Sequence, residues 1–543
     1  MAVDTGVVPA PARESHATRW RGHGVGFMVK LALMALVNAM GLMVAFSAWR
    51  IEAWGIFTGS VVLLVVIDWI YFSRRMVPLK YLAPGVAFLL VFQIFTMAYT
   101  AYVAFTNYGA QHNVTKGQAI EVLLLQNERK VEGTALYPLT FVQRGDELGL
   151  AIVDQGGVRV GSAQAPLTDA PDAVVAGTTV TQLPGWDVID TKRLYSDTDL
   201  ANALQDLRVP VSEDPNDGSV RANNLSQAAV YRSVLVYDAD TDTMVNVDTG
   251  VVYRATEEGF FRAEDGSRLG TGWRVYVGFD NFRRGFIDGD YVGPLLQITA
   301  WTFVFAVATV LSSFFLGLIL ALIFNDPRIK GRTIWRTLLI LPYAFPAFLS
   351  ALLWRGMFNA RFGIINDWLG TISGWFGGGD VYIPWLQDPT LAKFVILWVN
   401  LWLSYPYWFL VCTGALQAVP AETVEAARID GATRFRLFRS VQLPLLLVST
   451  APLIIASFAF NFNNFTVVYM LTSGDPTFPN ASIPLGQTDI LITAIYQISG
   501  VAAGSSSVAD YGLAAALSII VFVVIGALSA LAFRQTKKLE EMA

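Results

Sequence analysis

Eight long apolar stretches, separated by polar connections, constrain the fold of this chain more than any other feature of its sequence. They lie at roughly 27–48, 54–72, 82–106, 295–324, 336–358, 391–418, 446–472 and 511–533. A helix rises about 1.5 Å per residue, so about 20 apolar residues cross the ~30 Å hydrocarbon core of a bilayer. With 54% hydrophobic residues and a mean hydropathy of +0.47, the chain is too apolar for a soluble protein of 543 residues. The sequence therefore predicts a mainly α-helical membrane protein with about eight transmembrane helices.

One region differs in composition from the rest. Residues 107–293 hold 27 acidic and 16 basic residues, a net charge of −11, whereas the remainder has a net charge of +6. The region opens with a helical pattern at 116–126 and continues as short strands joined by turns, for example at 233–237, 244–247 and 251–254. We predict a separate, mostly β, soluble domain at 107–293. It divides the membrane part into 27–106 and 294–533, and polar segments remain at 1–26 and 534–543.

The basic residues of the short connections predict the orientation, because cytoplasmic loops carry an excess of Lys and Arg. They gather in alternate connections: Arg13, Arg19, Arg21; Arg74, Arg75, Lys80; Arg328, Lys330, Arg332; Arg428, Arg434, Arg436, Arg439; and Arg534, Lys537, Lys538. Both termini are therefore expected in the cytoplasm and residues 107–293 outside it. The single cysteine, Cys412, allows no intrachain disulfide, so the outer domain must be held by its own core.

A charged segment at 419–444 interrupts the apolar stretches. Pro420 suits the first turn of a helix, and Gly431 after Asp430 suits the left-handed residue that ends one. We predict a helix–turn–helix against the membrane surface. Its Glu425-Ala-Ala, Gly431 and Leu443-Pro444 resemble the signature loop of bacterial ATP-binding-cassette importer permeases. In that family the loop is a coupling helix that docks in a cleft of a cytoplasmic ATPase, which implies this role for Glu425, Ala426, Ala427, Asp430 and Gly431.

Polar residues also recur inside two apolar stretches. At the i, i+3, i+4 and i+7 positions of one predicted helix stand Ser457, Phe460, Asn461 and Asn464. The preceding stretch places Asn400, Ser404 and Tyr407 on a shared face, with Pro406 interrupting its hydrogen bonds at the same depth. Amides in hydrocarbon line a cavity or bind a neighbouring helix, and broken helices often hold a transporter's substrate. The alternatives are hydrogen bonds between helices and a simple proline kink.

The resemblance extends over about residues 20–540. The segments Ala104–Gly109, Gly272–Phe282, Ser457–Phe465 and Asp510–Ala516 are similar to the MalF family, the larger permease subunits of maltose/maltodextrin importers. This resemblance implies a type I importer permease fold in a bacterial inner membrane, with an immunoglobulin-like outer domain between helices 3 and 4. It implies four kinds of partner: a MalG-like permease, two MalK-like ATPases, a periplasmic or lipid-anchored maltose-binding protein, and maltose or maltodextrin itself.

The resemblance also implies a set of sugar contacts. Carried over residue by residue, they are Leu403, Ser404, Tyr407, Ser457, Phe460, Asn461 and Asn464. Ser404 stands where the family has a glycine, so the sequence leaves open maltose, longer maltodextrins and trehalose.

The chain is expected not to be an enzyme. No phosphate-binding Gly-x-x-x-x-Gly-Lys-Ser/Thr occurs, so ATP and Mg²⁺ are expected on a partner. Asp238, Asp240 and Asp242 suggest a calcium loop, but Thr243 and Thr249 replace its Gly and Glu, so no metal site is expected.

A membrane sensor is disfavoured because the cytoplasmic parts are short loops and a ten-residue tail. A proton-coupled carrier is disfavoured because few ionisable residues, Lys30 and Asp68 among them, fall inside the spans. No nucleic-acid partner is expected.

Overall fold

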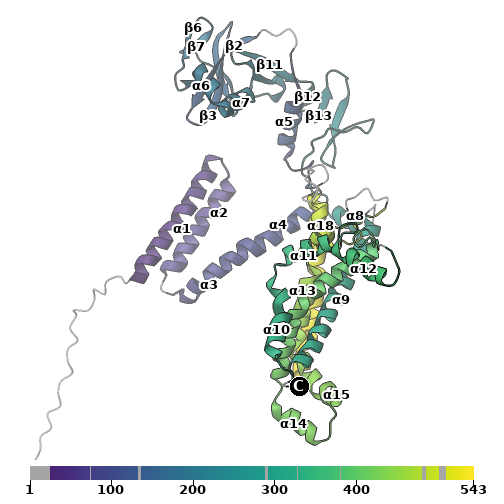
Figure 1. The fold of residues 1–543 in the computed structure, drawn as a ribbon. Coiled ribbons are helices and arrows are strands. Elements are labelled where there is room, and N and C mark those ends of the chain that lie inside the picture. Colours follow the sequence, from purple (N-terminus) through teal and green to yellow (C-terminus); the bar gives the residue numbers. More distant parts are fainter. Residues whose placement is uncertain are drawn as a thin grey trace, which may run out of the picture. The chain divides into compact units, whose positions relative to one another are not determined.

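The computed structural model describes residues 25–73, 75–131, 136–287, 291–326, 328–379, 381–479, 485–500 and 509–542. Nearly all of the predicted segment 1–26, and Arg74, lie outside these ranges. The chain divides into two compact units, Met1–Ala98 and Tyr99–Ala543. Figure 1 labels their helices and strands.

The first unit is entirely helical where it is described. It contains α1 (Val25–Arg50), α2 (Trp54–Phe72), α3 (Val77–Phe88) and the π-helical turn η1 (Leu89–Ile94), and α4 (Phe95–Ala104) continues into the second unit. Two polar contacts link α1 to α2: the Lys30 Nζ donates to the Tyr71 carbonyl at 2.6 Å, and the Asn38 Nδ2 donates to the Asp68 Oδ1 at 2.9 Å. The ionisable residues predicted inside these spans therefore have partners on the neighbouring helix.

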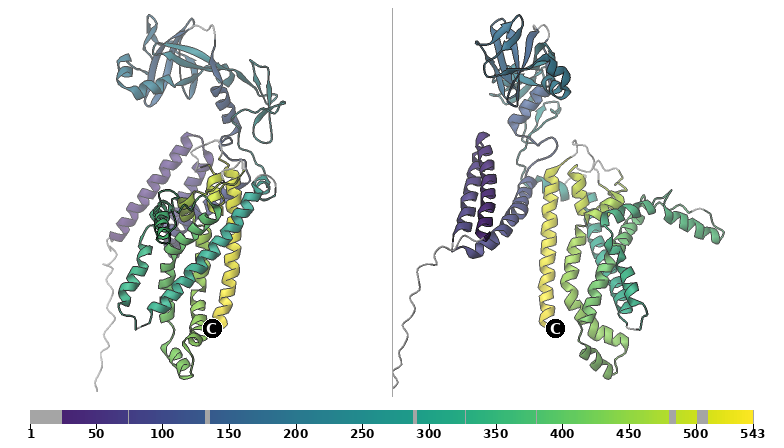
Figure 2. Two further views of the ribbon diagram at one scale, coloured as in Figure 1. Left: turned by 45° about the vertical axis from the view of Figure 1, so that its right-hand side comes forward. Right: turned by 60° about the vertical axis from the view of Figure 1, so that its left-hand side comes forward.

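The helices of the second unit form a bundle that contains most of the predicted spans (Figure 2). They are α8 (Asp280–Phe286), α9 (Val292–Phe324), α10 (Arg332–Ile340), η3 (Leu341–Ala344), α11 (Ala347–Met357), α12 (Ile364–Trp375), α13 (Pro389–Gln417), α14 (Ala421–Ile429), α15 (Arg434–Leu437), η4 (Phe438–Gln442), α16 (Leu443–Phe462), α17 (Phe465–Thr472), α18 (Leu491–Ile498) and α19 (Tyr511–Met542). Within the described ranges, seven helices are long and apolar enough to cross a membrane, or eight if one bent pair is a single span. The predicted number of spans is thus confirmed.

A β-rich region lies between α5 (Lys116–Gln126) and the bundle. Its strands are β1 (Glu128–Lys130), β2 (Tyr137–Arg144), β3 (Glu147–Asp154), β4 (Gly157–Ser162), β5 (Ala165–Asp169), β6 (Val174–Ala176), β7 (Thr179–Gln182), β8 (Asp187–Val188), β9 (Arg208–Pro210), β10 (Ser219–Asn224), β11 (Gln227–Ser233), β12 (Leu235–Asp238), β13 (Thr243–Asn246), β14 (Val252–Ala255) and β15 (Phe261–Ala263). Short helices α6 (Thr191–Ser196), α7 (Thr198–Gln205) and η2 (Pro215–Asp217) separate some of them. The mostly β prediction for this region is confirmed.

The strands pair antiparallel in one nine-stranded sheet, a β12–β15 meander and the β6–β7 pair. The nine-stranded sheet has the path β5-β4-β3-β2-β11-β10-β9, with β1 beside β11 and β8 beside β2. The predicted helix 116–126 coincides with α5, whose N-cap Thr115 and Gln118 form a reciprocal capping box. The predicted strands around 233–254 correspond to β12, β13 and β14. The immunoglobulin-like arrangement and the boundaries 107 and 293 stay predictions.

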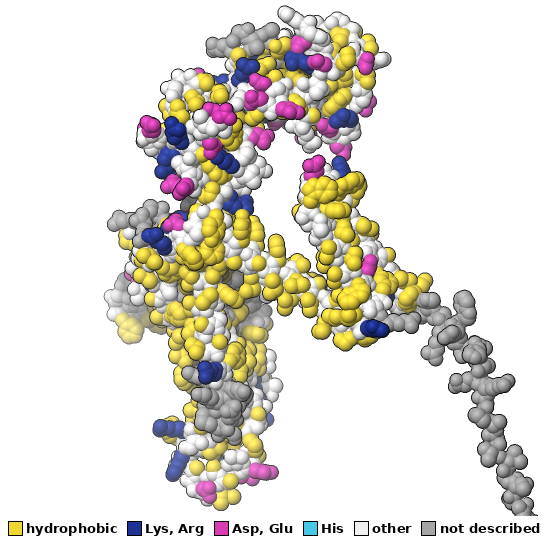
Figure 3. Space-filling model, turned by 180° about the vertical axis from the view of Figure 1, so that it is seen from behind, with side chains coloured by type: hydrophobic (Ala, Val, Ile, Leu, Met, Phe, Trp, Pro, Cys, Tyr) yellow, Lys and Arg dark blue, Asp and Glu magenta, His cyan; other side chains and the backbone are white. Residues whose placement is uncertain are grey.

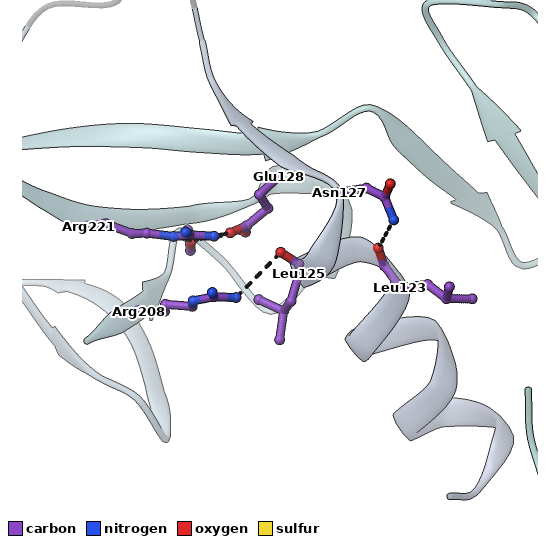
Figure 4. Close-up of polar contacts among 7 residues, drawn as sticks. Leu123, Leu125, Asn127, Glu128, Arg208 and Arg221 are labelled. Carbon is purple, nitrogen blue, oxygen red and sulfur yellow. Dashed lines mark hydrogen bonds and ion pairs between the residues drawn. The ribbon is translucent and has the colours of Figure 1, made fainter. Parts of the chain in front are cut away.

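A largely buried ion pair lies inside the large sheet, next to the end of α5 (Figure 4). The carboxylate of Glu128, on β1, pairs with the guanidinium of Arg221, on β10, and accepts a 2.9 Å hydrogen bond from the Ser219 hydroxyl. At the end of α5, the Asn127 side chain donates to the Leu123 carbonyl at 2.8 Å. The Arg208 Nη1, on β9, donates to the Leu125 carbonyl of α5 at 3.4 Å, so a hydrogen bond ties α5 to the sheet.

The aspartates of the β12–β13 turn have protein partners. Asp242 pairs with Lys116 and accepts a 3.0 Å hydrogen bond from the Tyr237 hydroxyl. Asp238 accepts from the Asp240 N–H at 3.0 Å and from the Thr241 hydroxyl at 2.7 Å. Within the described ranges, no three His, Cys, Asp or Glu side chains gather as metal ligands.

Side-chain types separate along the molecule as a membrane protein requires. Figure 3 shows hydrophobic side chains covering the helices, whereas charged side chains concentrate over the β-rich region and near one end of the bundle. In the bundle, α9 packs along α13, and their buried residues Phe314, Leu318, Trp408 and Phe409 form one core cluster. This pair of long helices forms the frame around which the functional site is built.

Candidate functional site

The bundle contains a cavity of about 580 Å³, which falls within the range of about 300–1,000 Å³ that is typical of small-molecule sites. It lies between the η3 and α11 segment, the middle of α13, and the α16–α17 segment. Its wall includes every residue that the sequence assigned to sugar binding: Leu403, Ser404, Tyr407, Ser457, Phe460, Asn461 and Asn464. The structure therefore brings the whole predicted set together around one space. Asn400, noted on the same face of α13, lines it as well.

An elbow forms one wall of the cavity and bends the predicted span at 336–358, which the apolar pattern did not indicate. The segments Arg332–Ala344 and Ala347–Met357 meet at an angle of 91°. Pro346 explains the bend, because proline forces the residue before it away from helical geometry. Phe345 accordingly has extended backbone angles. The elbow presents Tyr343, Phe345 and Ala347 to the cavity.

The break near the cavity lies on a different helix from the one the sequence predicted. Helix α13 is continuous through Pro406, which is buried, so the predicted interruption there is wrong. Packing against α9 holds α13 in helical form despite the missing N–H. The predicted single helix at 446–472 is instead divided into α16 and α17 at Asn463 and Asn464. The Asn464 side chain caps α17 by accepting from the Val467 N–H at 3.4 Å.

Three buried asparagines connect the cavity's helices. The Asn400 Nδ2 donates to the Asn461 Oδ1 at 2.8 Å and to the Thr309 Oγ1 at 3.2 Å, and the Asn464 Nδ2 donates to the Asn400 Oδ1 at 3.1 Å. The Asn461 Nδ2 donates to the Ser457 carbonyl at 2.9 Å. The amides thus bond one another across α9, α13, α16 and α17, while each also borders the cavity. Both interpretations of the polar face, a cavity lining and a link between helices, describe part of this arrangement.

The remaining members of the set are more accessible. Phe460, the aromatic residue of this set on α16, is 71% exposed. The other four residues are half-buried: Leu403, Ser404, Tyr407 and Ser457. An exposed phenyl ring beside amide and hydroxyl groups can cover the apolar face of a sugar while those groups bond its hydroxyls. The cavity therefore combines an exposed aromatic ring with buried asparagine side chains that are already hydrogen-bonded to one another.

A carboxyl group lies buried beyond the cavity, in the segment between α17 and α18. Asp489 is fully buried, and its Oδ2 accepts a 2.8 Å hydrogen bond from the Gly486 N–H. Burial away from water raises its pKa to about 6, against an ordinary value of 3.8. Nearby, the Thr488 hydroxyl donates to the Asp475 carbonyl at 2.7 Å and lies 2.9 Å from the Thr472 hydroxyl. This segment is fixed to the end of α17 by neutral hydrogen bonds.

The helix–turn–helix predicted at 419–444 is present. Gly431 follows α14 with a φ of +79°, in the left-handed region. Its N–H donates to the Arg428 carbonyl and the Ala432 N–H donates to the Ala427 carbonyl, both at 3.0 Å, which is the Schellman pattern of helix ends. Thr433 then caps α15.

The side chains of this turn are open. Glu425, Ala426, Asp430 and Gly431 are exposed, Ala427 is half-buried, and Ile429 is 86% exposed. In Figure 1, α14 and α15 lie at the opposite end of the bundle from α8 and α18. The predicted coupling residues therefore form an exposed, rigid turn remote from the cavity.

The sequence did not predict a junction at which three of the family-like segments, 104–109, 272–282 and 510–516, meet. Asn281 is buried, and its Nδ2 donates to the carbonyls of Ala104 at 2.9 Å and Thr106 at 2.8 Å. Arg284 donates to the Asn281 Oδ1 at 3.2 Å and forms a 2.7 Å ion pair with Asp510. The three segments 104–109, 272–282 and 510–516 thus converge. Their likeness to one family was the available signal, but it gave no indication that they touch.

A glycine makes this junction possible. A Cβ atom on Gly512 would lie 2.3 Å from the Thr106 carbonyl oxygen and 2.8 Å from the Asn281 Nδ2. Backbone atoms cannot move aside as a flexible side chain can, so a larger residue at 512 would separate α19 from the segment after α4.

Two family models and one solved structure match parts of the chain. Residues 87–164 match a family described as the N-terminal of the TM subunit in PBP-dependent ABC transporters, and residues 313–539 match the binding-protein-dependent transport system inner membrane component. A crystal structure of a bacterial ABC transporter involved in alginate import aligns with 48% of this chain and 84% of its own, at 23% identity and a TM-score of 0.41.

Curated relatives match almost the whole chain. The maltose/maltodextrin transport system permease protein MalF of Vibrio vulnificus strain YJ016 is 34% identical over 521 residues, covering 93% of this chain and 94% of that protein. MalF of Escherichia coli strain K12 is 33% identical over 513 residues, covering 93% and 96%. With this identity over nearly the full length, and with the permease domain in place, the chain belongs to the MalF family of ABC transporter permeases.

Proposed function

We propose that this protein is the larger permease subunit of an ABC importer that moves maltose and maltodextrins across the bacterial inner membrane. The observation that carries the proposal is the cavity, which gathers all seven residues of the family's sugar contacts although three come from α13 and four from the α16–α17 segment about 50 residues further along the chain. The family relationship supplies the substrate class. Ser404, on the cavity wall, adds a hydroxymethyl group that narrows the space and offers one more hydrogen bond.

The proposed assembly follows from the family. A MalG-like permease would form a heterodimer with this chain, two MalK-like subunits would bind ATP and Mg²⁺ and hydrolyse the ATP, and a periplasmic or lipid-anchored binding protein would deliver the sugar. Both termini and the α14–α15 turn would face the cytoplasm, with the β-rich region outside. The basic residues that gather on the α14–α15 side of the chain support this orientation.

The proposed chemistry of the site is binding without covalent change. The exposed ring of Phe460 would stack on a glucose ring, and Tyr407 and Ser404 would bond its hydroxyls. The asparagines have a second task, because Asn400 holds Asn461 and Asn464 in place. Sugar hydroxyls can replace such amide partners at little net cost, since one neutral hydrogen bond contributes only about 0.5–1.5 kcal/mol net.

Coupling is assigned to the α14–α15 turn. Its Schellman hydrogen bonds fix the angle between α14 and α15, and its exposed side chains leave it free to enter a cleft of an ATPase. Since η4 and α16 follow α15 directly, a push on this turn reaches the helix that carries Ser457, Phe460 and Asn461. Closure of the ATPases would in this way change which side of the membrane the cavity faces.

A matched pair of variants tests the site. In Phe460→Ala we expect uptake of labelled maltose per reconstituted complex to fall about tenfold, because an aromatic contact is worth about 0.5–1.5 kcal/mol. Phe315→Ala is the control, since Phe315 is 55% exposed on α9 and does not line the cavity. The yield of the complex and the ATPase activity stimulated by sugar-loaded binding protein should stay unchanged in both. Equal uptake in the two variants would remove Phe460 from the site.

A sugar panel tests the substrate. We expect maltose and short maltodextrins to stimulate ATP hydrolysis by the complex with its own binding protein, and trehalose to do so weakly. Stimulation by trehalose alone would redirect the proposal to another oligosaccharide while leaving the transport mechanism intact. A complex that binds sugar-loaded protein yet never hydrolyses ATP would contradict the importer function.

A further inference from the structure

Helix α12 has two faces of opposite character. Six apolar residues, Ile364, Ile365, Trp368, Leu369, Ile372 and Trp375, fall within an arc of about 140° when successive residues are rotated by 100°. The other six positions of the helix occupy the opposite arc: Asn366, Asp367, Gly370, Thr371, Ser373 and Gly374. Much of the apolar face is uncovered, since Trp375 is 78% and Trp368 is 58% exposed. Phe362 and Phe376, at the two ends, are 86% and 87% exposed.

The position of α12 is fixed at the end of the membrane-crossing helices. It follows α11 after residues 358–363, and at about 3.3 Å per extended residue this connection spans at most about 20 Å. Ile365 packs against the core cluster that contains Trp301 and Val395, so the first turn of α12 lies level with the ends of α9 and α13. In Figure 1, this is the end of the bundle where α8 and α18 lie, away from α14.

A buried asparagine holds the helix in this place. The Asn366 Nδ2 donates to the carbonyls of Ala360 at 2.9 Å and Ile383 at 3.1 Å, and its Oδ1 accepts from the Trp385 Nε1 at 2.7 Å. These bonds tie α12 both to the turn before it and to the segment that leads into α13. The helix is therefore a fixed part of the bundle, and its apolar face needs a fixed covering.

We propose that α12 is an interfacial membrane helix whose apolar face lies in the boundary between headgroups and acyl chains of one leaflet, on the side of the bundle where α8 lies. Tryptophan is enriched at this depth because its ring is apolar and its N–H is polar. Two tryptophans and two flanking phenylalanines give the face the composition of such an anchor. The polar face, with Asp367 and Thr371, points to water. This inference rests on membrane insertion alone and is independent of the transported sugar.

The charge of α12 predicts which lipids it needs. The helix carries Asp367 and no Lys or Arg, so attraction to anionic headgroups contributes little. Binding should therefore rest on burial of apolar surface, be as strong in phosphatidylcholine as in mixtures with phosphatidylglycerol, and resist salt. A docking surface for an acidic or basic protein partner would show the opposite dependence.

Nitroxide labels on the two faces test the proposal. Ile372→Cys lies on the apolar face and Asp367→Cys on the polar face, and Cys412, which is fully buried, stays in place with the unsubstituted chain as background. The full-length chain is assembled in nanodiscs, and collision rates with oxygen and with a water-soluble nickel chelate are measured. The oxygen-to-nickel ratio should be roughly fivefold higher at 372 than at 367, because oxygen concentrates in hydrocarbon and the chelate does not. Adding phosphatidylglycerol should leave both ratios unchanged.

Three results would overturn the inference. Equal ratios at 372 and 367 would place both faces in water. Low collision rates with both reagents at 372 would show that another protein covers the face. A ratio at 372 that rises only with phosphatidylglycerol would make electrostatic attraction the cause. Trp375→Cys, at the open end of the same face, repeats the measurement if the Ile372→Cys chain does not assemble, and the same three outcomes decide it.

Discussion

The cavity and the junction are each built around a buried asparagine, but the two asparagines bond different kinds of partner. Asn400 exchanges hydrogen bonds with the side chains of Asn461, Asn464 and Thr309. Asn281 bonds the main-chain carbonyls of two residues and the guanidinium of Arg284, which is itself paired with Asp510. Side-chain amides can rotate and exchange partners, whereas main-chain carbonyls fixed by their own segments cannot.

This difference indicates that the hydrogen bonds at the cavity can rearrange during the proposed transport cycle, whereas those at the Asn281 junction cannot. A network of neutral amides next to a cavity has replacement partners at hand, namely water or a bound hydroxyl compound. A junction of backbone and charge has none, because removal of one member strands the others in a buried place. We therefore expect substitutions in the two regions to differ in the free energy of unfolding and in their effect on transport.

The largest effect is expected at the junction. Asn281→Ala strands two carbonyl groups, each of which costs about 1–3 kcal/mol when buried without a donor, so we expect a loss of about 3–5 kcal/mol of stability. Thermal unfolding of the purified chain and the yield of assembled complex measure it. Asn202→Ala, at an exposed site on α7, is the matched control and should change neither. A loss below about 1 kcal/mol would show that the junction is as adaptable as the cavity.

Asp489 tests whether the region around α17 tolerates charge. Its pKa is raised in the folded chain to about 6, so between pH 4 and pH 6 the folded state holds more protons than the unfolded state, and stability falls as pH rises through this window. Asp489→Asn removes this titration. We compare the free energy of unfolding of the variant with that of the unsubstituted chain at each pH. We expect this difference to shift in favour of the variant by about 2–3 kcal/mol between pH 4 and pH 8. A stability difference that is independent of pH would show that folding does not raise the pKa of Asp489.

A smaller effect is expected at the cavity. Asn400→Ala removes the partner of Asn461 and Asn464, but water can enter the cavity and bond both, so we expect a stability loss of about 1–2 kcal/mol. Uptake per assembled complex should fall more than stability suggests, because the two freed amides are no longer held in one orientation. If Asn400→Ala destabilises the chain as much as Asn281→Ala, the contrast between the two regions disappears.

The smallest effect on stability is expected where no buried polar group is lost. Gly431→Ala forces a side chain into a left-handed conformation at an exposed turn, which costs about 1 kcal/mol locally. Transport should nevertheless fall, with complex yield unchanged, if the turn couples ATP hydrolysis to the bundle. Gly431→Asn is the control, since asparagine accepts this conformation and should retain more transport. Normal transport in Gly431→Ala would argue against the coupling role.

Features set by local patterns could be predicted from the sequence. The spans follow from apolar length, α5 from its cap and periodicity, and the α14–α15 turn from Pro420 and Gly431. Spacing alone placed Ser457, Phe460 and Asn461 on one helical face, and the structure brings them to one cavity. Each of these depends on residues close together in the chain.

Features that depend on competition between distant contacts could not be predicted from the sequence. Pro406 has the residue type of a helix break, but packing against α9 preserves the helix. Pro346 is also a proline and does produce an elbow, so two similar signals in the sequence have opposite outcomes. Asn464 is spaced like a member of α16 yet starts α17, because its side chain satisfies the first N–H groups of the new helix. The Asn281 junction joins residues more than 170 positions apart, which no local pattern reports.

The elbow has a consequence for how the cavity could change over evolution. Ala347, the first residue of α11, lines the cavity, and the residue before it, Pro346, makes no side-chain cap. The first turn of any helix carries N–H groups that its own carbonyls cannot reach, together with a partial positive charge. Any polarity that these N–H groups offer to the cavity belongs to the backbone, where a side-chain substitution cannot delete it. Sugar preference can drift through residues such as Ser404 while this donor set remains in every variant of the sequence.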